Sequence, residues 1–544
     1  MYGQEGTQQL PTIELTPLEQ TVRRLLLDVQ EYIGQTRHAQ CSAVQGDMVL
    51  RFTGGWVRDK LLGVTSHDID VAISTMTGLQ FGTYLKEYLD DPENLEKYKN
   101  CGQSVLSDDM LKIHKIEANP EKSKHLETIT TRLFGLDIDL VNLRKETYTE
   151  DSRNPQMEFG TAEEDALRRD ATVNAMFYNL NTSMLEDFTG LGIEDMRKKL
   201  IRTPLDPYQT FRDDPLRVLR LIRFASRLQY HIDEESQRAM QNDDIKQDLK
   251  LKISKERVGT EVEKMLQGKS SNYTHDRPDP RTALKYIGDL GLYSVIFENQ
   301  QDDAEPNIAS WSLAYDALDG IMRLPDREDH HSLSVKHIRD ILMRDETERN
   351  HAWVIAAFVP WALVPAREPR SKTEKPPVMA RAAEVARDNL RMDNKTISLL
   401  RDAATHFRDA SALKTSVVLN SITGTAAEVR QHVGLQIRYW KKDWRMIVIM
   451  ALLQELVAGA ECSQVIREYD VFLSYLEREE LLEVTELKPI ANGNEVSAAL
   501  GVRGGKWMST ALEMLIKWQL LHPEIAEKDQ ALEELKDRRA ELGV

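Results

Sequence analysis

Two aspartates, Asp68 and Asp70, lie two residues apart in a stretch that is otherwise apolar. Side chains of a β-strand alternate between its two faces, so both carboxylates point to one face while Ile69, Val71 and Ile73 point to the other. Adjacent carboxylates repel each other and are costly to bury without a cation or strong hydrogen-bond donors. Paired oxygen ligands suit Mg²⁺, which keeps coordination positions for substrate phosphates. The pair therefore predicts a metal site for phosphate chemistry rather than a solvated edge strand.

Two glycines, Gly54 and Gly55, separate a predicted strand at 48–52 from a short predicted helix. Glycines at this position let backbone N–H groups approach a phosphate, and the helix N-terminus adds its dipole. A glycine pair by itself usually marks an ordinary turn, but here a carboxylate pair follows on the next strand. Asp137 or Asp139, on a later alternating strand, offers a third acid. Together these parts predict nucleotidyl transfer, in which two metal ions about 4 Å apart stabilise the attacking hydroxyl and the departing pyrophosphate.

A later segment combines Asp214 with arginines at helical spacing. Pro215 suits the first turn of a helix, and one face of that helix is expected to carry Arg217, Arg220, Arg223 and Arg227. Taken alone, Asp213 or Asp214 as a helix cap and a solvated arginine face would be the commoner interpretation. However, Asp214 could accept from the amino group of cytosine or adenine while Arg217 donates to the neighbouring ring nitrogen. Uracil and guanine present the reverse order, and an unpaired buried polar group costs roughly 1–3 kcal/mol. This pair therefore predicts selection of C and A without a nucleic-acid template.

Five segments resemble, in order, the motifs of the class II CCA-adding enzymes, which are tRNA nucleotidyltransferases of the polymerase-β-like superfamily. They are Gly54 to Gly63 with Asp68-Ile69-Asp70, Arg168 to Ala175, Asp187 to Gly192 with Asp195, Asp213 to Arg217, and Ser254 to Val258 with Glu261. In the fourth segment Asp213 replaces the glutamate common in the family, and Asp139 falls at the family's third strand acid. Five ordered matches are far more specific than any one of them.

The resemblance implies an enzyme that adds C, C and A to the 3′ end of tRNA from CTP and ATP and releases pyrophosphate. Its catalytic acids would be Asp68, Asp70 and Asp139, of which Asp68 and Asp70 would bind two Mg²⁺ ions. Its nucleotide-binding residues would be Gly54, Gly55, Arg58 and Asp59 for the triphosphate, Arg168, Arg169, Asp170 and Asn174 for the ribose side, and Asp214, Arg217 and Arg220 for the base. Glu256 and Arg257 are expected to brace a helix. Lys145 to Gly160 is expected to be a mobile loop, for which the resemblance implies a role in the switch from C to A addition.

Length and composition bound the remaining choices. The chain has 544 residues, of which 41% are hydrophobic, so several domains are expected. Three scattered cysteines imply neither a disulfide framework nor a zinc site, which fits a reducing compartment. A net charge of -17 confines any nucleic-acid surface to a local patch. Because there is neither a membrane-spanning apolar run nor a signal peptide, we expect a soluble protein of the cytoplasm and nucleus with no membrane partner, and a longer form could reach the mitochondrion. The sequence does not fix the oligomeric state, and a monomer is favoured.

The order of predicted elements indicates an α+β fold, with an N-terminal mixed-sheet nucleotidyltransferase head followed by a mostly α-helical neck, body and tail. Helical spacing begins at Leu18, strands and helices are mixed up to about residue 200, and the rest is almost wholly helical. The expected parts are an N-terminal extension and helix at 1–33, the catalytic head at 34–200, the neck at 201–277, the body at 278–400 and a tRNA-binding tail at 401–544.

Basic residues in the C-terminal half are a weaker indication of an RNA surface. The run from Arg438 to Arg445 interleaves Lys441 and Lys442 with aromatic residues, as a backbone-and-stacking surface would. Its two tryptophans, four residues apart, fit a half-buried helix at least as well. Arg503 and Lys506, in a glycine-rich turn, are further candidates for contacts with tRNA phosphates.

Two other functions remain open. The nearest has the same head and another product, as in a poly(A)-adding enzyme or one restricted to CC or to A. A different class would be a non-catalytic RNA-binding protein with a decayed head, which the intact Asp68, Asp70, Asp214 and Arg217 argue against. A metal site at Asp329-His330-His331 is not favoured, because adjacent histidines in a charged loop are more often exposed.

Overall fold

The computed structural model describes residues 11–38, 47–66, 68–99, 117–118, 129–149, 152–267, 278–323, 329–371, 373–375, 378–524 and 527–544. Contacts divide the chain into two compact units, Met1–Val295 and Ile296–Val544. The first unit holds the sheet and the second is helical, which confirms the predicted fold class.

The first unit contains a seven-stranded mixed sheet in the order β3-β4-β5-β2-β1-β8-β9. Its strands are β1 (Leu50–Thr53), β2 (Asp68–Ile73), β3 (Glu117–Ala118), β4 (Ile129–Leu133), β5 (Leu136–Asn142), β8 (Phe177–Asn179) and β9 (Met184–Glu186). β2 and β5 run parallel, and the other neighbouring strands are antiparallel. β2, the strand of the carboxylate pair, is therefore central, and β1 and β5 flank it.

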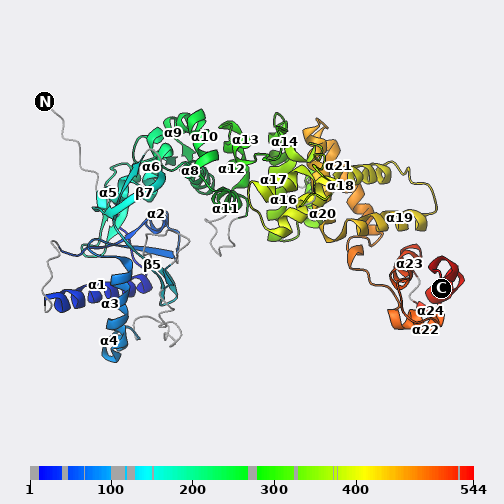
Figure 1. Cartoon of the computed structure of the whole chain (residues 1–544), viewed down its shortest axis with the longest axis horizontal. Helices are drawn as coiled ribbons and strands as arrows, with labels where there is room; N and C mark the ends of the chain where they lie inside the picture. Colours follow the sequence, from blue (N-terminus) through cyan, green and yellow to red (C-terminus); the bar gives the residue numbers. More distant parts are fainter. Residues whose placement is uncertain are drawn as a thin grey trace. The chain divides into compact units, whose positions relative to one another are not determined.

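Two helices, α1 (Pro17–His38) and α3 (Gly78–Asp90), lie together beside this sheet (Figure 1). Their apolar side chains share one core with Ile69, Val71 and Ile73, the residues that alternate with the acids. Within the head the chain also forms α2 (Gly55–Leu61), between β1 and β2, and α4 (Pro92–Lys99). α1 therefore contributes to the core of the head. The expected domain boundaries, including the one at residue 33, stay predictions.

The segment 145–160 was expected to be a loop, but its described residues form the paired strands of a β-hairpin instead. β6 (Arg144–Thr149) pairs antiparallel with β7 (Ser152–Phe159), and the register shifts between Thr147 and Thr149. Pro155 lies in the irregular stretch opposite that shift, where the lack of an N–H donor is tolerated. The many charges made the segment resemble a loop, but its threonines and tyrosine favour strand geometry.

Helices complete the first unit. They are α5 (Ala162–Leu167), η2 (Thr172–Asn174), α6 (Gly192–Lys198), α7 (Pro207–Asp213), α8 (Leu216–Leu228), α9 (Glu234–Gln241), α10 (Asp243–Lys252), α11 (Lys255–Leu266) and α12 (Pro280–Asp289), and α13 (Tyr293–Ile296) spans the division between the units. A short parallel pair, β10 (Leu200–Ile201) and β11 (His231–Ile232), lies among them. α8 packs against α11 and α12, which positions the predicted base-reading helix.

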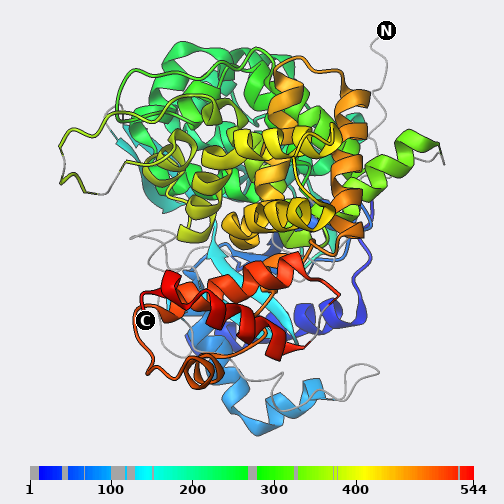
Figure 2. The same cartoon turned by 90° about the vertical axis from the view of Figure 1, so that its right-hand side faces the viewer.

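The second unit consists of helices. They are α14 (Trp311–Met322), α15 (His330–Leu342), α16 (Glu346–Ala362), α17 (Arg381–Asp388), α18 (Asn394–Val418), α19 (Ala426–Tyr439), η3 (Lys441–Asp443), α20 (Trp444–Val457), α21 (Cys462–Arg478), η4 (Val484–Glu486), α22 (Gly493–Leu500), α23 (Met508–Leu521), α24 (Lys528–Asp537) and η5 (Arg539–Leu542). α20 is mostly apolar and buried along most of its length, as expected of a helix at the centre of a bundle. The last three helices share a smaller core of their own and are drawn in orange to red in Figure 2.

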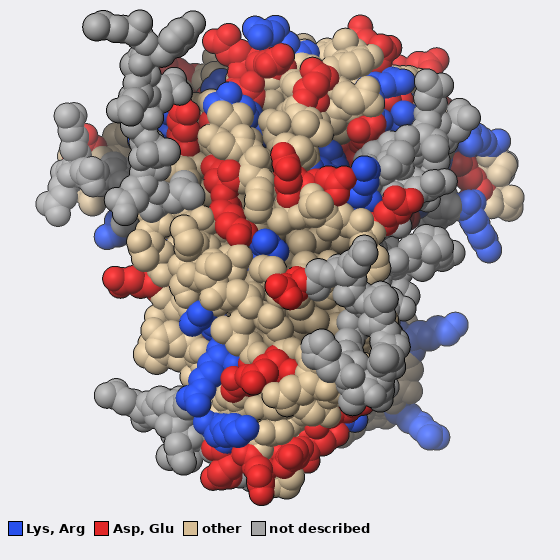
Figure 3. All heavy atoms as spheres, turned by 90° about the vertical axis from the view of Figure 1, so that its left-hand side faces the viewer, with Lys and Arg blue, Asp and Glu red and all other residues tan. Residues whose placement is uncertain are grey.

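On the face drawn in Figure 3, acidic and basic side chains are interspersed among uncharged surface. None of the helices in the described ranges has the length and apolar character needed to cross a bilayer.

Candidate active site

The four acids of β2 and β5 lie opposite one another in register. Asp68 is paired with Asp137 and Asp70 with Asp139, so all four share the face opposite the core. The alternation predicted for β2 is confirmed, because Ile69, between the two acids, is fully buried. Oγ1 of Thr130 donates to Oδ1 of Asp139 at 2.5 Å, whereas Nε of Arg132 lies 3.5 Å from Oδ1 of Asp137.

Gly54 lies next to both Asp70 of the acid pair and Arg169 of the second motif. Its φ is +73°, a conformation that favours glycine. A Cβ atom added at Gly54 would lie 3.1 Å from Oδ2 of Asp70 and 3.2 Å from Nη1 of Arg169. The absence of a side chain at this turn therefore leaves room next to both a carboxylate and a guanidinium group.

Asn174 connects the first two motifs. Nη1 of Arg58, on α2, donates to Oδ1 of Asn174 at 2.6 Å, and Nε of Arg58 donates to Oδ1 of Asp59 at 2.8 Å. Nη1 of Arg169 donates to the backbone oxygen of Asn174 at 3.1 Å. One residue thus holds both Arg58, predicted for the triphosphate, and Arg169, predicted for the ribose side, beside the glycine turn.

Asp170 joins the second motif to helix α8. Its Oδ2 accepts from Nε of Arg220 at 2.5 Å, and its Oδ1 lies 3.3 Å from Nε of Arg217. Burial by itself would raise the pKa of Asp170, but the positive charges of Arg220 and Arg217 outweigh it and lower that pKa. Nη2 of Arg217 also donates to the backbone oxygen of Arg168 at 2.9 Å. The structure therefore ties Asp170, predicted for the ribose side, to the predicted base-reading arginines.

Asp214 stands at the start of α8. The N-cap residue of α8 is Pro215, but Oδ1 of Asp214 accepts from the first backbone N–H of the helix, that of Leu216, at 3.2 Å, and its Oδ2 lies 3.4 Å from Nη2 of Arg257. On the neighbouring α11, Oε2 of Glu261 accepts from Nε of Arg223 at 2.7 Å. Glu261 of the fifth motif therefore braces α8, and Arg257 contacts the residue two positions before that helix.

Asp165 is a residue of the site that sequence reasoning missed. Its Oδ1 accepts from Nη2 of Arg168 at 2.6 Å and its Oδ2 from Nη2 of Arg169 at 3.0 Å. The side chain is only 2% exposed. Burial by itself would raise the pKa of Asp165, but Arg169 and Arg168 outweigh it and lower that pKa. The available signal was the spacing of three and four residues, which places both arginines over Asp165 on one helical face.

The C-terminal candidates separate into core and surface residues. Trp440 and Trp444 are buried, so these two tryptophans form core and not a stacking surface. Nη1 of Arg438 donates to the backbone oxygens of Val484 and Leu487, at 2.5 and 2.9 Å, and so ties α19 to η4.

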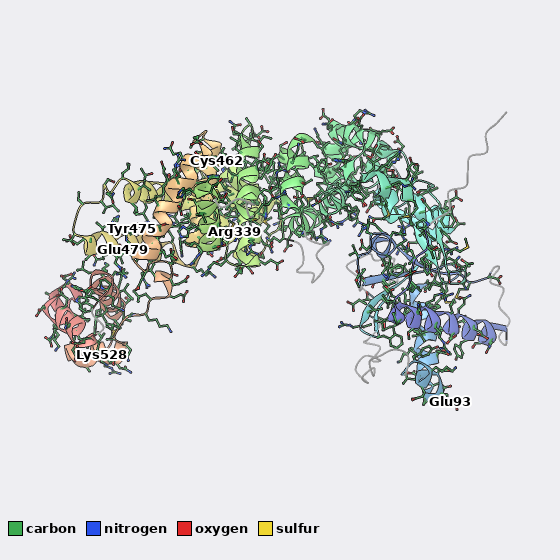
Figure 4. All side chains as sticks on the ribbon, turned by 180° about the vertical axis from the view of Figure 1, so that it is seen from behind. Glu93, Arg339, Cys462, Tyr475, Glu479 and Lys528 are labelled. Atoms are coloured by element: carbon green, nitrogen blue, oxygen red, sulfur yellow. The ribbon has the colours of Figure 1, made fainter. Side chains whose placement is uncertain are left out.

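The other candidates are exposed: Lys441, Lys442, Arg503 and Lys506. By contrast, Nζ of Lys528, labelled in Figure 4, lies 2.7 Å from Oε1 of Glu495 and links α24 to α22. Asp329 accepts from the backbone N–H of Ser332 and caps α15, while the two histidines after it are exposed.

Comparison with known proteins places the chain in a family. Residues 50–202 match the model of the poly A polymerase head domain. The sequence is 38% identical to the nucleotidyltransferase lcsQ of Purpureocillium lilacinum over 98% of this chain and 93% of the relative. It is 36% identical to the mitochondrial CCA tRNA nucleotidyltransferase of Candida glabrata over 96% and 95%, and 35% identical to that of Saccharomyces cerevisiae over 94% and 92%. The chain belongs to the CCA tRNA nucleotidyltransferase family.

Solved structures share the fold of this nucleotidyltransferase. A CCA-adding enzyme in its apo form I matches with a TM-score of 0.59 and 19% identity, over 96% of this chain and 94% of the other. The Thermotoga maritima CCA-adding enzyme complexed with tRNA matches with a TM-score of 0.57 and 18% identity, over 96% and 95%. The succession of sheet and helices therefore extends over nearly the whole length of both chains.

Nucleotidyltransferases of this superfamily generally use divalent metal ions, and the acid pair fits that requirement. Asp68 and Asp70 offer carboxylate oxygens on one face of β2, next to a turn without a side chain. In the part of the chain that the structure describes, no three His, Cys, Asp or Glu side chains gather as a metal-binding group. Two carboxylates leave coordination positions for substrate phosphates, which is the usual arrangement for Mg²⁺.

Proposed function

We propose that this nucleotidyltransferase adds C, C and A to the 3′ end of tRNA, using CTP and ATP and releasing pyrophosphate. The observation that carries the proposal is made at Gly54, where an added Cβ atom would lie 3.1 Å from Oδ2 of Asp70 and 3.2 Å from Nη1 of Arg169. A carboxylate of the acid pair and a guanidinium group therefore meet at the glycine turn. The proposal is supported by relatives named CCA tRNA nucleotidyltransferase that match nearly the whole chain.

Asp68 and Asp70 are the proposed metal-binding and catalytic acids, and Asp139 is the proposed third acid. When bound, two Mg²⁺ ions would stabilise the attacking 3′ hydroxyl oxygen and the leaving pyrophosphate. Asp139 is preferred over Asp137 because it lies opposite Asp70, whereas Asp137 is 56% exposed and faces Arg132.

The triphosphate is proposed to lie against the turn at Gly54 and Gly55. Backbone N–H groups at the start of α2 approach it, and Arg58 and Arg169 neutralise its charge. Because Asn174 holds both guanidinium groups beforehand, they need little reorganisation when the nucleotide binds. Asn174 is also the proposed contact for the ribose.

Asp214 and Arg217 are proposed to read the pairing edge of the incoming base. Arg217 is held from two sides, by Asp170 and by the backbone oxygen of Arg168, so its direction is fixed. Asp214 has one oxygen on the first N–H of α8, and its other oxygen makes only a long contact of 3.4 Å with Arg257. The amino group of C or A would donate a shorter hydrogen bond to this second oxygen of Asp214. U or G would instead place a carbonyl acceptor opposite it.

The nearest rival is a nucleotidyltransferase with the same head and another product. It has support of its own, because the relative that matches at 38% identity carries the name nucleotidyltransferase with no mention of tRNA. A poly(A)-adding enzyme, or one restricted to CC or to A, would also keep Asp68, Asp70 and the glycine turn.

Tests of the product separate these candidates. The purified protein is incubated with tRNA that ends before its CCA, with each nucleoside triphosphate in turn and then with CTP and ATP together, and product length is read. We expect two additions from CTP alone and three from the mixture. A long tail from ATP alone would indicate a poly(A)-adding enzyme, growth by one kind of nucleotide only would indicate a restricted enzyme, and no growth under any condition would indicate a non-catalytic protein.

The proposed macromolecular partner is tRNA, held in part by the exposed Lys441, Lys442, Arg503 and Lys506. We propose a monomer. Two relatives are named as mitochondrial, which supports a mitochondrial form beside one in the cytoplasm and nucleus.

A further inference from the structure

One buried carboxylate joins the base of the β6–β7 hairpin to both arginines of the second motif. Besides its bonds to Arg168 and Arg169, Asp165 accepts from the backbone N–H of Arg144, the first residue of β6. That N–H donates to Oδ1 at 3.2 Å, the same oxygen that accepts from Arg168. Because a carboxylate is a rigid planar group, a shift of one partner moves the acceptors of the other two.

The opposite side of the hairpin base is closed by Gly160. Its N–H donates to the backbone oxygen of Leu143 at 3.1 Å. A Cβ atom added at Gly160 would lie 2.5 Å from the carbonyl carbon of Arg144 and 2.6 Å from the backbone nitrogen of Lys145. A side chain at this position must therefore displace the backbone of the residue whose N–H reaches Asp165.

The two arginines extend this connection to both halves of the nucleotide site. Nη1 of Arg169 lies 3.2 Å from the Cβ position of Gly54, on the triphosphate side. The backbone oxygen of Arg168 accepts from Arg217, on the base side. A displacement at Asp165 thus reaches the groups proposed to hold the triphosphate and the base.

We propose that Asp165 is a positioning residue that transmits the position of the hairpin base to Arg168 and Arg169, and through them to the bound nucleotide. This inference rests on the proposed function, because it takes Arg169 and Arg217 as nucleotide-binding groups. The consequence is that kcat/KM for CTP and ATP responds to a change at Gly160. None of the hydrogen bonds described above joins Gly160 to either arginine.

Charge and position predict opposite effects when Asp165 is replaced. Asp165→Asn removes a negative charge beside two arginines, which by electrostatics alone would strengthen triphosphate binding and lower the KM for CTP and ATP. If Asp165 acts by positioning, the loosened arginines instead raise KM and lower kcat, because a displacement of about 1 Å in a catalytic site can cost roughly 100-fold in rate.

The test is a double-mutant cycle of Asp165→Asn and Gly160→Ala in the full-length protein. We expect each single variant to lower kcat/KM for CTP and ATP by about 10- to 100-fold. Because both changes act through the same contact, the double variant should lose about as much as the worse single one. Losses that multiply, or an unchanged or raised kcat/KM for Asp165→Asn, would overturn the proposal.

Asp248→Asn is the matched control for the loss of a buried carboxylate. Asp248 also has two cationic partners, Arg212 at 2.8 Å and Lys252 at 2.9 Å, and lies on α10 outside the proposed site. It should lose thermal stability and keep its kcat/KM. If Asp165→Asn fails to fold, Gly160→Ala alone decides, because an unchanged kcat/KM for both CTP and ATP would refute transmission. A wild-type protein that transfers another nucleotide would overturn the proposed function, but the cycle could still be measured with that nucleotide.

Discussion

Asp70 and Gly54 determine what can approach the centre of the site. Asp70 stands on a strand whose alternate residues are buried, so its carboxylate has one direction available, and Gly54 turns beside it without a side chain. The chemistry of the site thus depends on the carboxylate of Asp70 and on the absence of a side chain at Gly54.

Asp70→Asn should reduce nucleotide incorporation by about 1,000-fold or more, because losing a charged metal ligand removes several kcal/mol of transition-state stabilisation. Asp90→Asn, an exposed carboxylate at the end of α3, should have no such effect. Incorporation of labelled CTP into truncated tRNA measures both variants. Near-normal activity of Asp70→Asn would show that the metal assignment is wrong.

Gly54→Ala and Gly63→Ala form a matched pair. Both glycines have φ of +73°, so both variants should lose at least roughly 1–2 kcal/mol of stability from backbone strain. Gly54→Ala should lose more, because ψ at Gly54 is −140°, outside the left-handed helical region. A Cβ at Gly63 meets nothing within 4 Å, whereas one at Gly54 crowds Asp70 and Arg169. Both variants should therefore melt below the wild type, Gly54→Ala more so, while kcat/KM falls only for Gly54→Ala, by about 100-fold. An equal loss of activity in both variants would contradict the role of the open space at Gly54.

At the scale of elements, α8 is fixed by ionic contacts from two sides. Asp170 holds Arg217 and Arg220 from the second motif, and Glu261 of α11 holds Arg223. The direction of the proposed base-reading groups is therefore set by the head and by α11 together.

The pH dependence of stability should reveal the contact between Asp170 and α8. The pKa of Asp170 is lowered from its ordinary 3.8 because Arg220 and Arg217 outweigh burial. A lowered pKa in the folded state stabilises the protein above the unfolded pKa, and this contribution is lost as pH falls through the folded pKa. Asp170→Asn should lower Tm by roughly 4–6 °C at neutral pH, since losing a buried charge-assisted bond costs about 2–3 kcal/mol.

The difference in Tm between wild type and Asp170→Asn should shrink below about pH 4, where the carboxylate becomes protonated. Differential scanning calorimetry across this range measures it. A constant difference at all pH values would mean that packing, and not charge, accounts for the loss.

Alternation and helical spacing were sufficient to predict β2, β5, the glycine turn and the arginine face of α8, because these patterns act within one element. They could not predict that Asp170 would contact Arg220, fifty residues later in sequence. The hairpin at 144–159 was mistaken for a loop because its charges dominated its composition. Helical spacing could have predicted the contacts of Asp165, because Arg168 and Arg169 follow it by three and four residues. The two arginines were instead grouped with Asp170 and Asn174, which follow them.

The chain as a whole is acidic, whereas its proposed partner, tRNA, is a polyanion. Because the net charge is -17, phosphate contacts must come from local groups of exposed cations. Trp440 and Trp444 are buried and cannot stack on bases. Lys441 and Lys442 remain exposed between α19 and α20.

Reversing both charges, in Lys441→Glu with Lys442→Glu, should raise the KM for tRNA and leave the KM for CTP unchanged. If both lysines contact phosphates, the slope of log affinity against log salt concentration should fall by about 1 to 2 units. Filter binding at several salt concentrations measures the slope. An unchanged slope would show that tRNA does not contact this turn.

We propose that a site made only of protein selects C, C and A in order. Sequencing the 3′ ends of truncated tRNA after incubation with the purified protein and all four nucleoside triphosphates together tests this selection. We predict that nearly every extended end carries C, C and A and that growth then stops. Ends that carry U or G, or a continuing run of A, would contradict it.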